Sequence, residues 1–167
     1  MICGDITNKE IFKLVNTSIK ENKCEFLIAT PPCQGMSSLG KKEYSTDKRN
    51  YLVFYVMDII EDNDFNYILI ENVPKFLKLY FPYNGELLDL ETILNLKFGN
   101  KYKIETFVLN AADYGVPQSR PRGFVKMYKK CLKWDMPKLQ KRITLREAIG
   151  FLPSLESGES SKYKWHY

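Results

Sequence analysis

Helix-like and strand-like segments alternate along most of this sequence, and that alternation constrains the fold more than any other feature. Apolar residues at helical spacing predict a helix from about Asn8 to Lys20, begun by a capping box of Thr7 and Glu10. The short apolar runs EFLIAT and NYILIEN predict buried strands. Between them, NYLVFYVMDIIED is apolar almost all round and predicts a buried helix.

The alternation continues in the second half. The segment ELLDLETILNLKF predicts a helix with Leu87, Leu90 and Leu94 on one face, and KYKIETFVLNA and GFVKMYKK predict two strands. A second capping box, Thr144 with Glu147, predicts a short helix near the end. This order of elements predicts an α/β sheet with helices on both faces.

The length and composition indicate one globular domain. The 167 residues can bury one sizeable core, and 44% of them are apolar while 27% are charged. We expect residues 1–150 to form the domain and residues 151–167 to be a polar tail, because periodicity is lost there. No apolar run is long enough to cross a bilayer and no signal-peptide pattern is present, which predicts an intracellular protein without membrane contact.

Charge and cysteine usage narrow the chemistry. The net charge is +5, and many basic residues lie between Lys129 and Arg146. This is compatible with a polyanionic partner and equally with a solvated, lysine-rich surface. The cysteines are Cys3, Cys24, Cys33 and Cys131, without a C-x-x-C pair, and the only histidine is His166. We therefore expect neither a metal site nor a disulfide framework.

Three polar clusters follow predicted strands: PPCQ at 31–34, ENV at 71–73 and AADYGVPQSRPR at 111–122. Taken singly, each has a structural explanation: a cysteine in a tight turn, a capping glutamate and surface arginines. Reactive groups of α/β sheets, however, gather at the carboxyl ends of strands. A thiol, a carboxylate and two arginines there suit chemistry on an electron-poor ring. The lack of a usable histidine argues against a cysteine-protease dyad.

In this order, the clusters resemble the motifs of the cytosine-5 DNA methyltransferase family. The matching blocks are GDI at 4–6, PPCQGMS at 31–37, ENVPKF at 71–76 and QSRPR at 118–122, the last preceded by LNAADYGVP. They span most of the chain, from Gly4 to about Tyr128. The resemblance implies a partial Rossmann-like, S-adenosylmethionine-dependent methyltransferase sheet whose last strand is antiparallel.

The resemblance also implies catalytic roles. Cys33 would attack C6 of a cytosine swung out of the duplex, so that C5 becomes nucleophilic enough to accept a methyl group. Glu71 would hold or protonate N3, which neutralises the developing charge. Arg122, with Arg120, would orient the ring oxygen and the thiolate and lower the pKa of the cysteine.

The remaining assignments concern ligands. By the same resemblance, the adenine of S-adenosylmethionine would contact Asp5 and Ile6, its methionine part would lie near Pro32, and Leu52 would line the pocket. Five further residues would form the binding site for the substrate, double-stranded DNA: Gln34, Ser37, Asn72, Val73 and Gln118. Among them, Asn72 and Val73 would shape the strand end that holds Glu71, and Gln34 and Ser37 would approach the backbone or sugar of the displaced nucleotide.

Several family segments have no counterpart in this sequence. They are the Phe-x-Gly-x-Gly loop, the acidic ribose-binding residue, the target-recognition region and a final helix with a Gly-Asn pair. We therefore expect a central catalytic portion, completed by a second polypeptide or by further segments of the same protein, in a bacterial or phage cytoplasm and a restriction–modification context. A transfer-RNA cytosine-5 methyltransferase and a non-catalytic or degenerate copy of the same fold remain alternatives.

Overall fold

The structure, a computed structural model, describes residues 1–32, 48–156, 159 and 162. The chain divides into two compact units. The first comprises Met1–Leu109 and Pro121–Met136, and the second comprises Asn110–Arg120 and Pro137–Tyr167. Each unit is described by itself.

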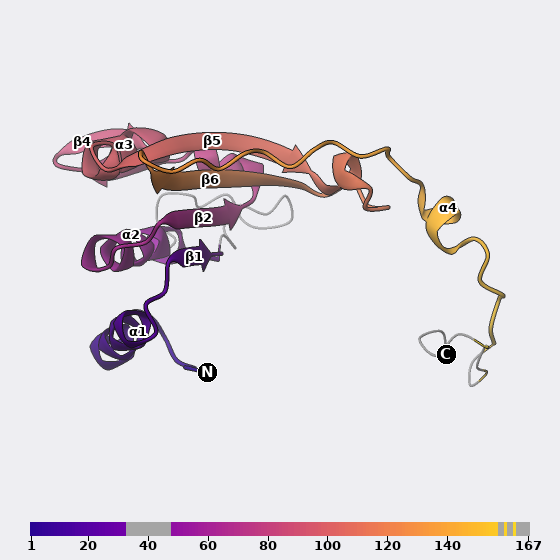
Figure 1. Cartoon of the computed structure of the whole chain (residues 1–167), viewed down its shortest axis with the longest axis horizontal. Coiled ribbons are helices and arrows are strands. Elements are labelled where there is room, and N and C mark those ends of the chain that lie inside the picture. Colours follow the sequence, from indigo (N-terminus) through magenta and orange to yellow (C-terminus); the bar gives the residue numbers. More distant parts are fainter. Residues whose placement is uncertain (33–47, 157–158, 160–161, 163–167) are drawn as a thin grey trace. The chain divides into compact units, whose positions relative to one another are not determined.

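The first unit is built on a four-stranded sheet (Figure 1). Its spatial order is β1-β2-β6-β5, formed by β1 (Phe26–Ala29), β2 (Tyr67–Asn72), β6 (Pro121–Lys129) and β5 (Tyr102–Asn110). β1 and β2 are parallel, whereas β6 runs antiparallel to β2. The predicted α/β sheet with an antiparallel last strand is therefore confirmed.

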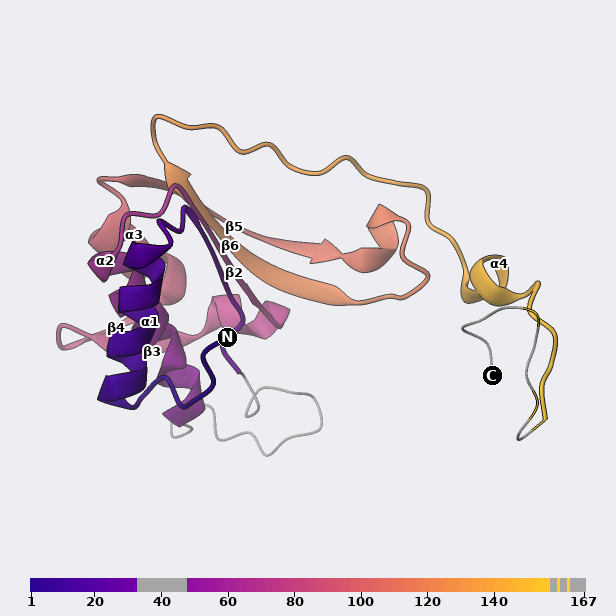
Figure 2. The same ribbon diagram turned by 60° about the horizontal axis from the view of Figure 1, so that its bottom comes forward.

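Helices cover one face of this sheet. Figure 2 shows α1 (Lys9–Glu21), α2 (Leu52–Asp62) and α3 (Leu90–Phe98) gathered on the same side of the strands. Residues on this face alternate along β2 and β6, and the ladder pairs Ile68 with Met127 and Ile70 with Val125. All four are almost fully buried and form one core with the apolar residues of the helices.

The expectation of helices on both faces is wrong for the described residues. The chain passes from β1 through α2 to β2, and then through α3 to β5, always moving in the same direction across the sheet. Because such crossovers are right-handed, helices of successive crossovers in one direction lie on the same face. Helices on both faces require the chain to reverse its direction across the sheet.

Part of the opposite face is covered by residues 130–136, which follow β6. The ring of Trp134 packs edge-on against the rings of Phe26 and Tyr67, with centroids 5.5 Å away in both cases. Lys126, on the same face of the sheet, is buried. Its ammonium donates to the Trp134 carbonyl at 2.9 Å and lies 2.6 Å from a Glu105 carboxylate oxygen. The bond from Lys126 holds the pKa of Glu105 below its usual range.

The predicted capping residue of α1 is wrong. Asn8, not Thr7, caps α1: its side chain accepts from the backbone N–H groups of Glu10 and Ile11. The Thr7 hydroxyl instead donates to Asp5. The predicted capping box before α4 (Leu145–Ile149) is confirmed.

The predicted helix over ELLDLETILNLKF is divided into a strand and a helix. Its first residues form β4 (Glu86–Asp89), which pairs antiparallel with β3 (Tyr80–Tyr83), and α3 begins only after the Asp89 cap. Asn84 and Gly85 both adopt positive φ, as a tight hairpin turn requires. Leu87 is therefore exposed on a hairpin rather than aligned on a helix. The described 3-10 segments are η2 (Lys48–Tyr51), η3 (Pro74–Lys78) and η4 (Ala111–Tyr114).

Replacing Glu105 with Gln is expected to lower the free energy of unfolding by about 2–3 kcal/mol, because buried Lys126 loses its carboxylate partner. Lys103→Met is the control: its exposed ammonium lies 3.0 Å from the same carboxylate, and its loss is expected to cost much less stability than Glu105→Gln because water screens an exposed pair. Urea unfolding measures both. Equal losses of unfolding free energy in the two variants would show that the burial of Lys126 does not make its pairing with Glu105 more stabilising.

The same pair predicts a pH dependence. Since the folded-state pKa of Glu105 is lowered, its stabilising contribution is present above the ordinary glutamate pKa and is lost as the pH falls through the lowered value. The unmodified chain should therefore lose more stability than Glu105→Gln between about pH 6 and about pH 3. Parallel stability curves would contradict this.

Candidate catalytic site

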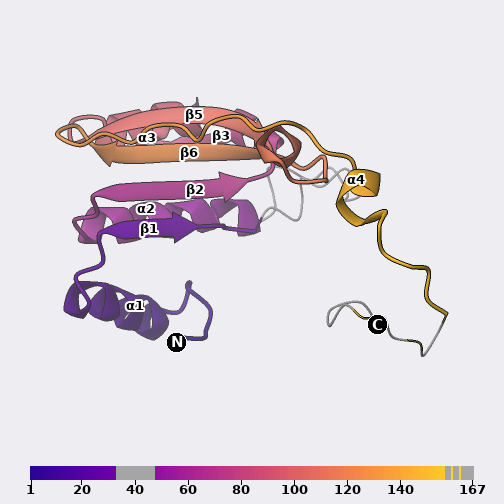
Figure 3. The same ribbon diagram turned by 45° about the vertical axis from the view of Figure 1, so that its right-hand side comes forward.

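The ends of three strands meet at one edge of the sheet, the edge formed by the carboxyl ends of β1 and β2. β1 and β2 both finish there because they are parallel, and β6 begins there because it is antiparallel to β2 (Figure 3). Asn72, the last residue of β2, pairs with Gly123, and Glu71 pairs with Phe124. Arg122 lies two residues before Phe124, so its side chain and that of Glu71 project from the same face.

Glu71 and Arg122 form an ion pair at this edge. Arg122 Nε lies 2.8 Å from Glu71 Oε1, and the side chains are 27% and 24% exposed for Glu71 and Arg122 respectively. One guanidinium nitrogen, Nη1, also donates to the Pro121 carbonyl at 2.8 Å. The pair thus combines an acceptor and donors that are fixed in place yet reachable from solvent. Such a combination suits a ring that carries both an N–H and a carbonyl.

Asn72 connects this pair to the end of β1. Its Nδ2 donates to the Pro31 carbonyl at 2.9 Å, and its Oδ1 accepts from the Val73 N–H at 2.8 Å. Pro31 and Pro32 are the last described residues before a gap. The predicted nucleophile Cys33, with the predicted DNA contacts Gln34 and Ser37, lies outside the described residues, and these three assignments stay predictions.

The η3 turn after Val73 packs closely on β6. A side chain at Gly123 would place its Cβ 3.0 Å from Leu77 Cγ and 3.3 Å from Pro74 Cα. Such contacts are tighter than ordinary packing, so a side chain here would force Leu77 or Pro74 to move by a few tenths of an ångström, and glycine avoids this. The close approach keeps the residues that follow Glu71 against the strand that carries Arg122.

Two further predicted residues, Gln118 and Arg120, belong to the second unit, where both are exposed. The Asn110 side chain accepts from the backbone N–H groups of Ala112 and Arg120, at 3.2 Å and 2.9 Å, and so closes the loop between them. Gly115, with φ of 78°, makes the turn within it. The joint action of Arg120 with Arg122, and the DNA contact of Gln118, stay predictions.

The four predicted cofactor residues all lie in the first unit. Asp5 is exposed, and the pKa of its carboxyl lies below its usual range mainly because the Thr7 backbone N–H donates to it at 2.9 Å. Ile6 and Leu52 are half-buried, whereas Pro32 is exposed. An ionised carboxylate beside a half-buried apolar side chain fits a ligand that presents amino or hydroxyl donors on a flat ring.

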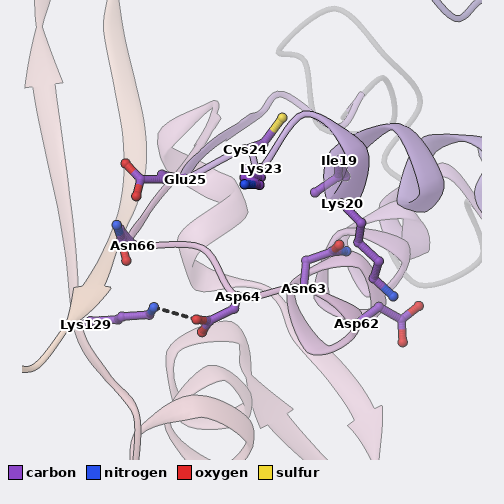
Figure 4. Close-up of a pocket in the computed structure, with 10 residues that line it drawn as sticks. All are labelled: Ile19, Lys20, Lys23, Cys24, Glu25, Asp62, Asn63, Asp64, Asn66 and Lys129. Carbon is purple, nitrogen blue, oxygen red and sulfur yellow. Dashed lines mark hydrogen bonds and ion pairs between the residues drawn. The ribbon is translucent and has the colours of Figure 1, made fainter.

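A cavity of about 490 Å³ lies at the other end of the sheet (Figure 4). Glu25 and Asn66, which line it, immediately precede β1 and β2, and Lys129 ends β6. Lys129 is 2.8 Å from Asp64, and hydrogen bonds from Lys101 and Lys129 lower the pKa of Asp64 to about 2. The cavity is therefore separate from the Glu71–Arg122 pair.

Within the part of the chain that the structure describes, no cluster of three His, Cys, Asp or Glu side chains could hold a metal ion. Among the same residues, no helix is long and apolar enough to cross a membrane.

The roles of Asn110 and Gly123 were not predicted from the sequence, and for Asn72 the sequence predicted a part in shaping the end of β2 but not its bonding partner. Strand alternation places Asn72 on the buried side of β2, where a polar residue needs a partner, so its burial was detectable. Its partner, the Pro31 carbonyl, is 41 residues away and was not detectable from local pattern.

Comparisons with known proteins are consistent with this geometry. A family model described as C-5 cytosine-specific DNA methylase matches residues 1–167. Type II methyltransferase M1.HgaI of Avibacterium volantium is 44% identical over 171 residues, which cover 100% of this chain and 48% of that protein. Type II methyltransferase M.MthTI of Methanothermobacter thermautotrophicus is 37% identical over 129 residues, which cover 75% of this chain and 38% of that protein.

A solved structure of a prophage-encoded E. coli protein, assigned as a DNA modification methyltransferase, has a TM-score of 0.63 and 28% identity. The match covers 91% of this chain and 42% of that one. The chain therefore spans about half the length, or less, of the proteins that it resembles.

Gly123→Ala is expected to destabilise the chain by about 1–3 kcal/mol, because the new methyl group meets Leu77 and Pro74. Combining it with Leu77→Ala should cost less than the sum of the two single changes, since the shortest contact is removed. Urea unfolding of the three variants measures this coupling. Strict additivity would show that the close approach of η3 to β6 does not require glycine.

Proposed function

Because the chain belongs to the C-5 cytosine-specific DNA methylase family, we propose that it forms the catalytic portion of a DNA (cytosine-5) methyltransferase of a restriction–modification system. The observation that carries this proposal is the Glu71–Arg122 pair at the carboxyl ends of β1 and β2. The segment that leads to Cys33 is tied to the same edge through Asn72.

In the proposed reaction, Cys33 is the nucleophile. Its thiolate forms a bond to C6 of cytosine, and the electron pair of the C5–C6 double bond makes C5 nucleophilic. Glu71 shares a proton with N3, which neutralises the charge that develops on the ring. Arg122, assisted by Arg120, donates to the ring oxygen. C5 then takes the methyl group, and S-adenosylhomocysteine is the leaving group. The C5 proton passes to a water molecule, the C5–C6 double bond reforms and the Cys33 thiolate is expelled.

The methyl donor is proposed to be S-adenosylmethionine, which when bound supplies a methyl group activated by a sulfonium. Asp5 would accept hydrogen bonds from its adenine, and Ile6 would contact the flat ring. Pro32 and Leu52 would contact the rest of the molecule. The exposed, ionised Asp5 beside half-buried Ile6 supports this assignment.

A cytosine inside a duplex cannot reach these residues, so the target base has to be flipped out. We propose that Gln34, Ser37 and Gln118 contact the DNA around the displaced nucleotide. The side chain of Val73 is partly buried against the core, which supports a role in shaping the end of β2. The short distance between Glu71 and Arg122 supports their joint recognition of one ring.

We also propose that the sheet is completed by further polypeptide, either a second chain or more of the same protein. β1 is an edge strand, and its residues Phe26 and Ile28 are 44% and 62% exposed. An open edge with exposed apolar side chains is a surface on which another strand can pair. The greater length of the related methyltransferases supports the presence of such a segment.

The catalytic proposal can be tested in a chimera. In M1.HgaI, the segment that matches this chain is replaced by the chain itself, and the product is incubated with S-adenosylmethionine and DNA containing 5-fluorocytosine. The fluorine cannot leave as a proton does, so a covalent protein–DNA complex should accumulate. Cys33→Ala should abolish it, and Glu71→Gln should slow its formation by roughly 100-fold or more.

Cys24→Ala is the matched control, because it removes an exposed thiol at the other end of β1 and should leave adduct formation unchanged. An adduct that forms equally well without the Cys33 thiol would overturn the proposal. Tritium transfer to transfer RNA but not to DNA would reject DNA as the substrate.

The proposed strand pairing gives a separate prediction. Ile28→Asp should barely change the stability of this chain, because the side chain is mostly exposed, but should prevent activation by the remaining M1.HgaI segments supplied as a separate polypeptide. Leu14→Asp, at a 50% exposed position on α1, is the control and should permit activation. Equal activation of both variants would exclude pairing at β1.

A further inference from the structure

We propose that Asn72 is a positioning residue, which holds the turn before Cys33 in fixed register with Glu71 and Arg122. This inference rests on the proposed function and concerns how its site is held together. It makes specific the expectation that Asn72 shapes the strand end at Glu71, and it assigns the side chain a partner inside the protein in place of a DNA contact.

The Asn72 side chain has little opportunity to contact a ligand. The residue is only 4% exposed, and both ends of its amide have protein partners. Its Nδ2 donates to the Pro31 carbonyl at 2.9 Å, and its Oδ1 accepts from the Val73 N–H at 2.8 Å. A buried amide that is bonded at both ends has a fixed orientation, because losing either bond leaves a buried polar group unsatisfied.

The sequence of the turn explains why such an anchor is needed. Proline has no backbone N–H, so neither Pro31 nor Pro32 can donate a hydrogen bond to a neighbouring strand. After β1 ends at Ala29, this stretch can therefore be held in place through its carbonyl groups only when another group donates to them. Asn72 Nδ2 is that donor for Pro31.

The position of Asn72 joins all parts of the site. It follows Glu71 directly in β2, faces Gly123 across the β2–β6 ladder, and is bonded to the turn beyond β1. Arg122, the ion-pair partner of Glu71, precedes Gly123. A shift of Pro31 relative to Asn72 would therefore move the nucleophile relative to the carboxylate, and displacements of about 1 Å can cost roughly 100-fold in rate.

Two substitutions separate the bonds. Asn72→Ala removes both, whereas Asn72→Asp keeps the oxygen that accepts from Val73 and loses the donor to Pro31. Asn63→Ala is the matched control: Asn63 is also buried, and its Nδ2 donates to the Ile59 carbonyl, but it lies near the opposite end of the sheet, beside the cavity of Figure 4.

The first measurement uses this chain alone and requires no methyl transfer. Hydrogen exchange by mass spectrometry should show faster exchange in Phe26 to Thr30 for both Asn72 variants, with α2 and α3 unchanged. Iodoacetamide alkylation, followed peptide by peptide over a pH series, should show an altered profile for Cys33 only. Cys24 and Cys131 are exposed and serve as internal controls.

The second measurement is the activity of the M1.HgaI chimera. Both Asn72 variants should lower kcat by roughly 10- to 100-fold with KM for DNA changed by less than about twofold, since the nucleophile is displaced and DNA contacts are kept. Asn63→Ala should lower thermal stability without altering the Cys33 profile or kcat.

Any one of the following results would overturn the inference: an unchanged Cys33 profile in both Asn72 variants, an Asn72→Asp variant whose Cys33 profile and kcat match those of the unmodified chain, or the same Cys33 change in Asn63→Ala. An increase in KM for DNA at constant kcat would also overturn it and restore the DNA contact. If the chimera forms no DNA adduct, the proposed function fails, while the exchange and alkylation results still decide whether Asn72 holds the turn.

Discussion

The antiparallel pairing of β6 with β2 is the constraint on which the candidate site depends. Glu71 is near the end of β2 and Arg122 is near the beginning of β6, and only opposite strand directions bring those positions to one edge of the sheet. If β6 were parallel, the arginine would lie at the other edge, where the cavity beside Lys129 is found. The 2.8 Å ion pair is thus a consequence of topology, and the loop that reverses the chain before β6 makes it possible.

Elements with strong local sequence signals could be predicted from the sequence. The apolar runs that became β1 and β2, and the capping box before α4, were recognisable because each depends on residues within a few positions. Where two local signals competed, prediction failed. Asn8 displaced Thr7 as the cap of α1, and the turn at Asn84 and Gly85 removed Leu87 from a helical pattern that otherwise seemed continuous.

Other features depend on partners far along the chain, and no local pattern contains them. The acceptor of Asn72 is 41 residues away, and buried Lys126 is stabilised by Glu105 on the neighbouring strand together with the Trp134 carbonyl. Which face the helices cover likewise depends on the direction of every crossover. Ordered motifs predicted which residues form the site, and the tertiary structure adds that Asn72 bonds the end of β2 to the turn after β1.

The two faces of the sheet are stabilised in different ways, and this difference bears on how the sheet folds. One face is buried by α1, α2 and α3 in an apolar core that does not depend on β1 having another neighbour. The other face is covered in part by residues 130–136, which Lys126 and the aromatic contacts of Trp134 hold in place. Within the described residues, apolar exposure in the sheet is greatest at Ile28, on the edge strand. Because the buried core residues come almost entirely from the described helices and strands, an added strand beside β1 is not needed to bring the ends of β1, β2 and β6 together.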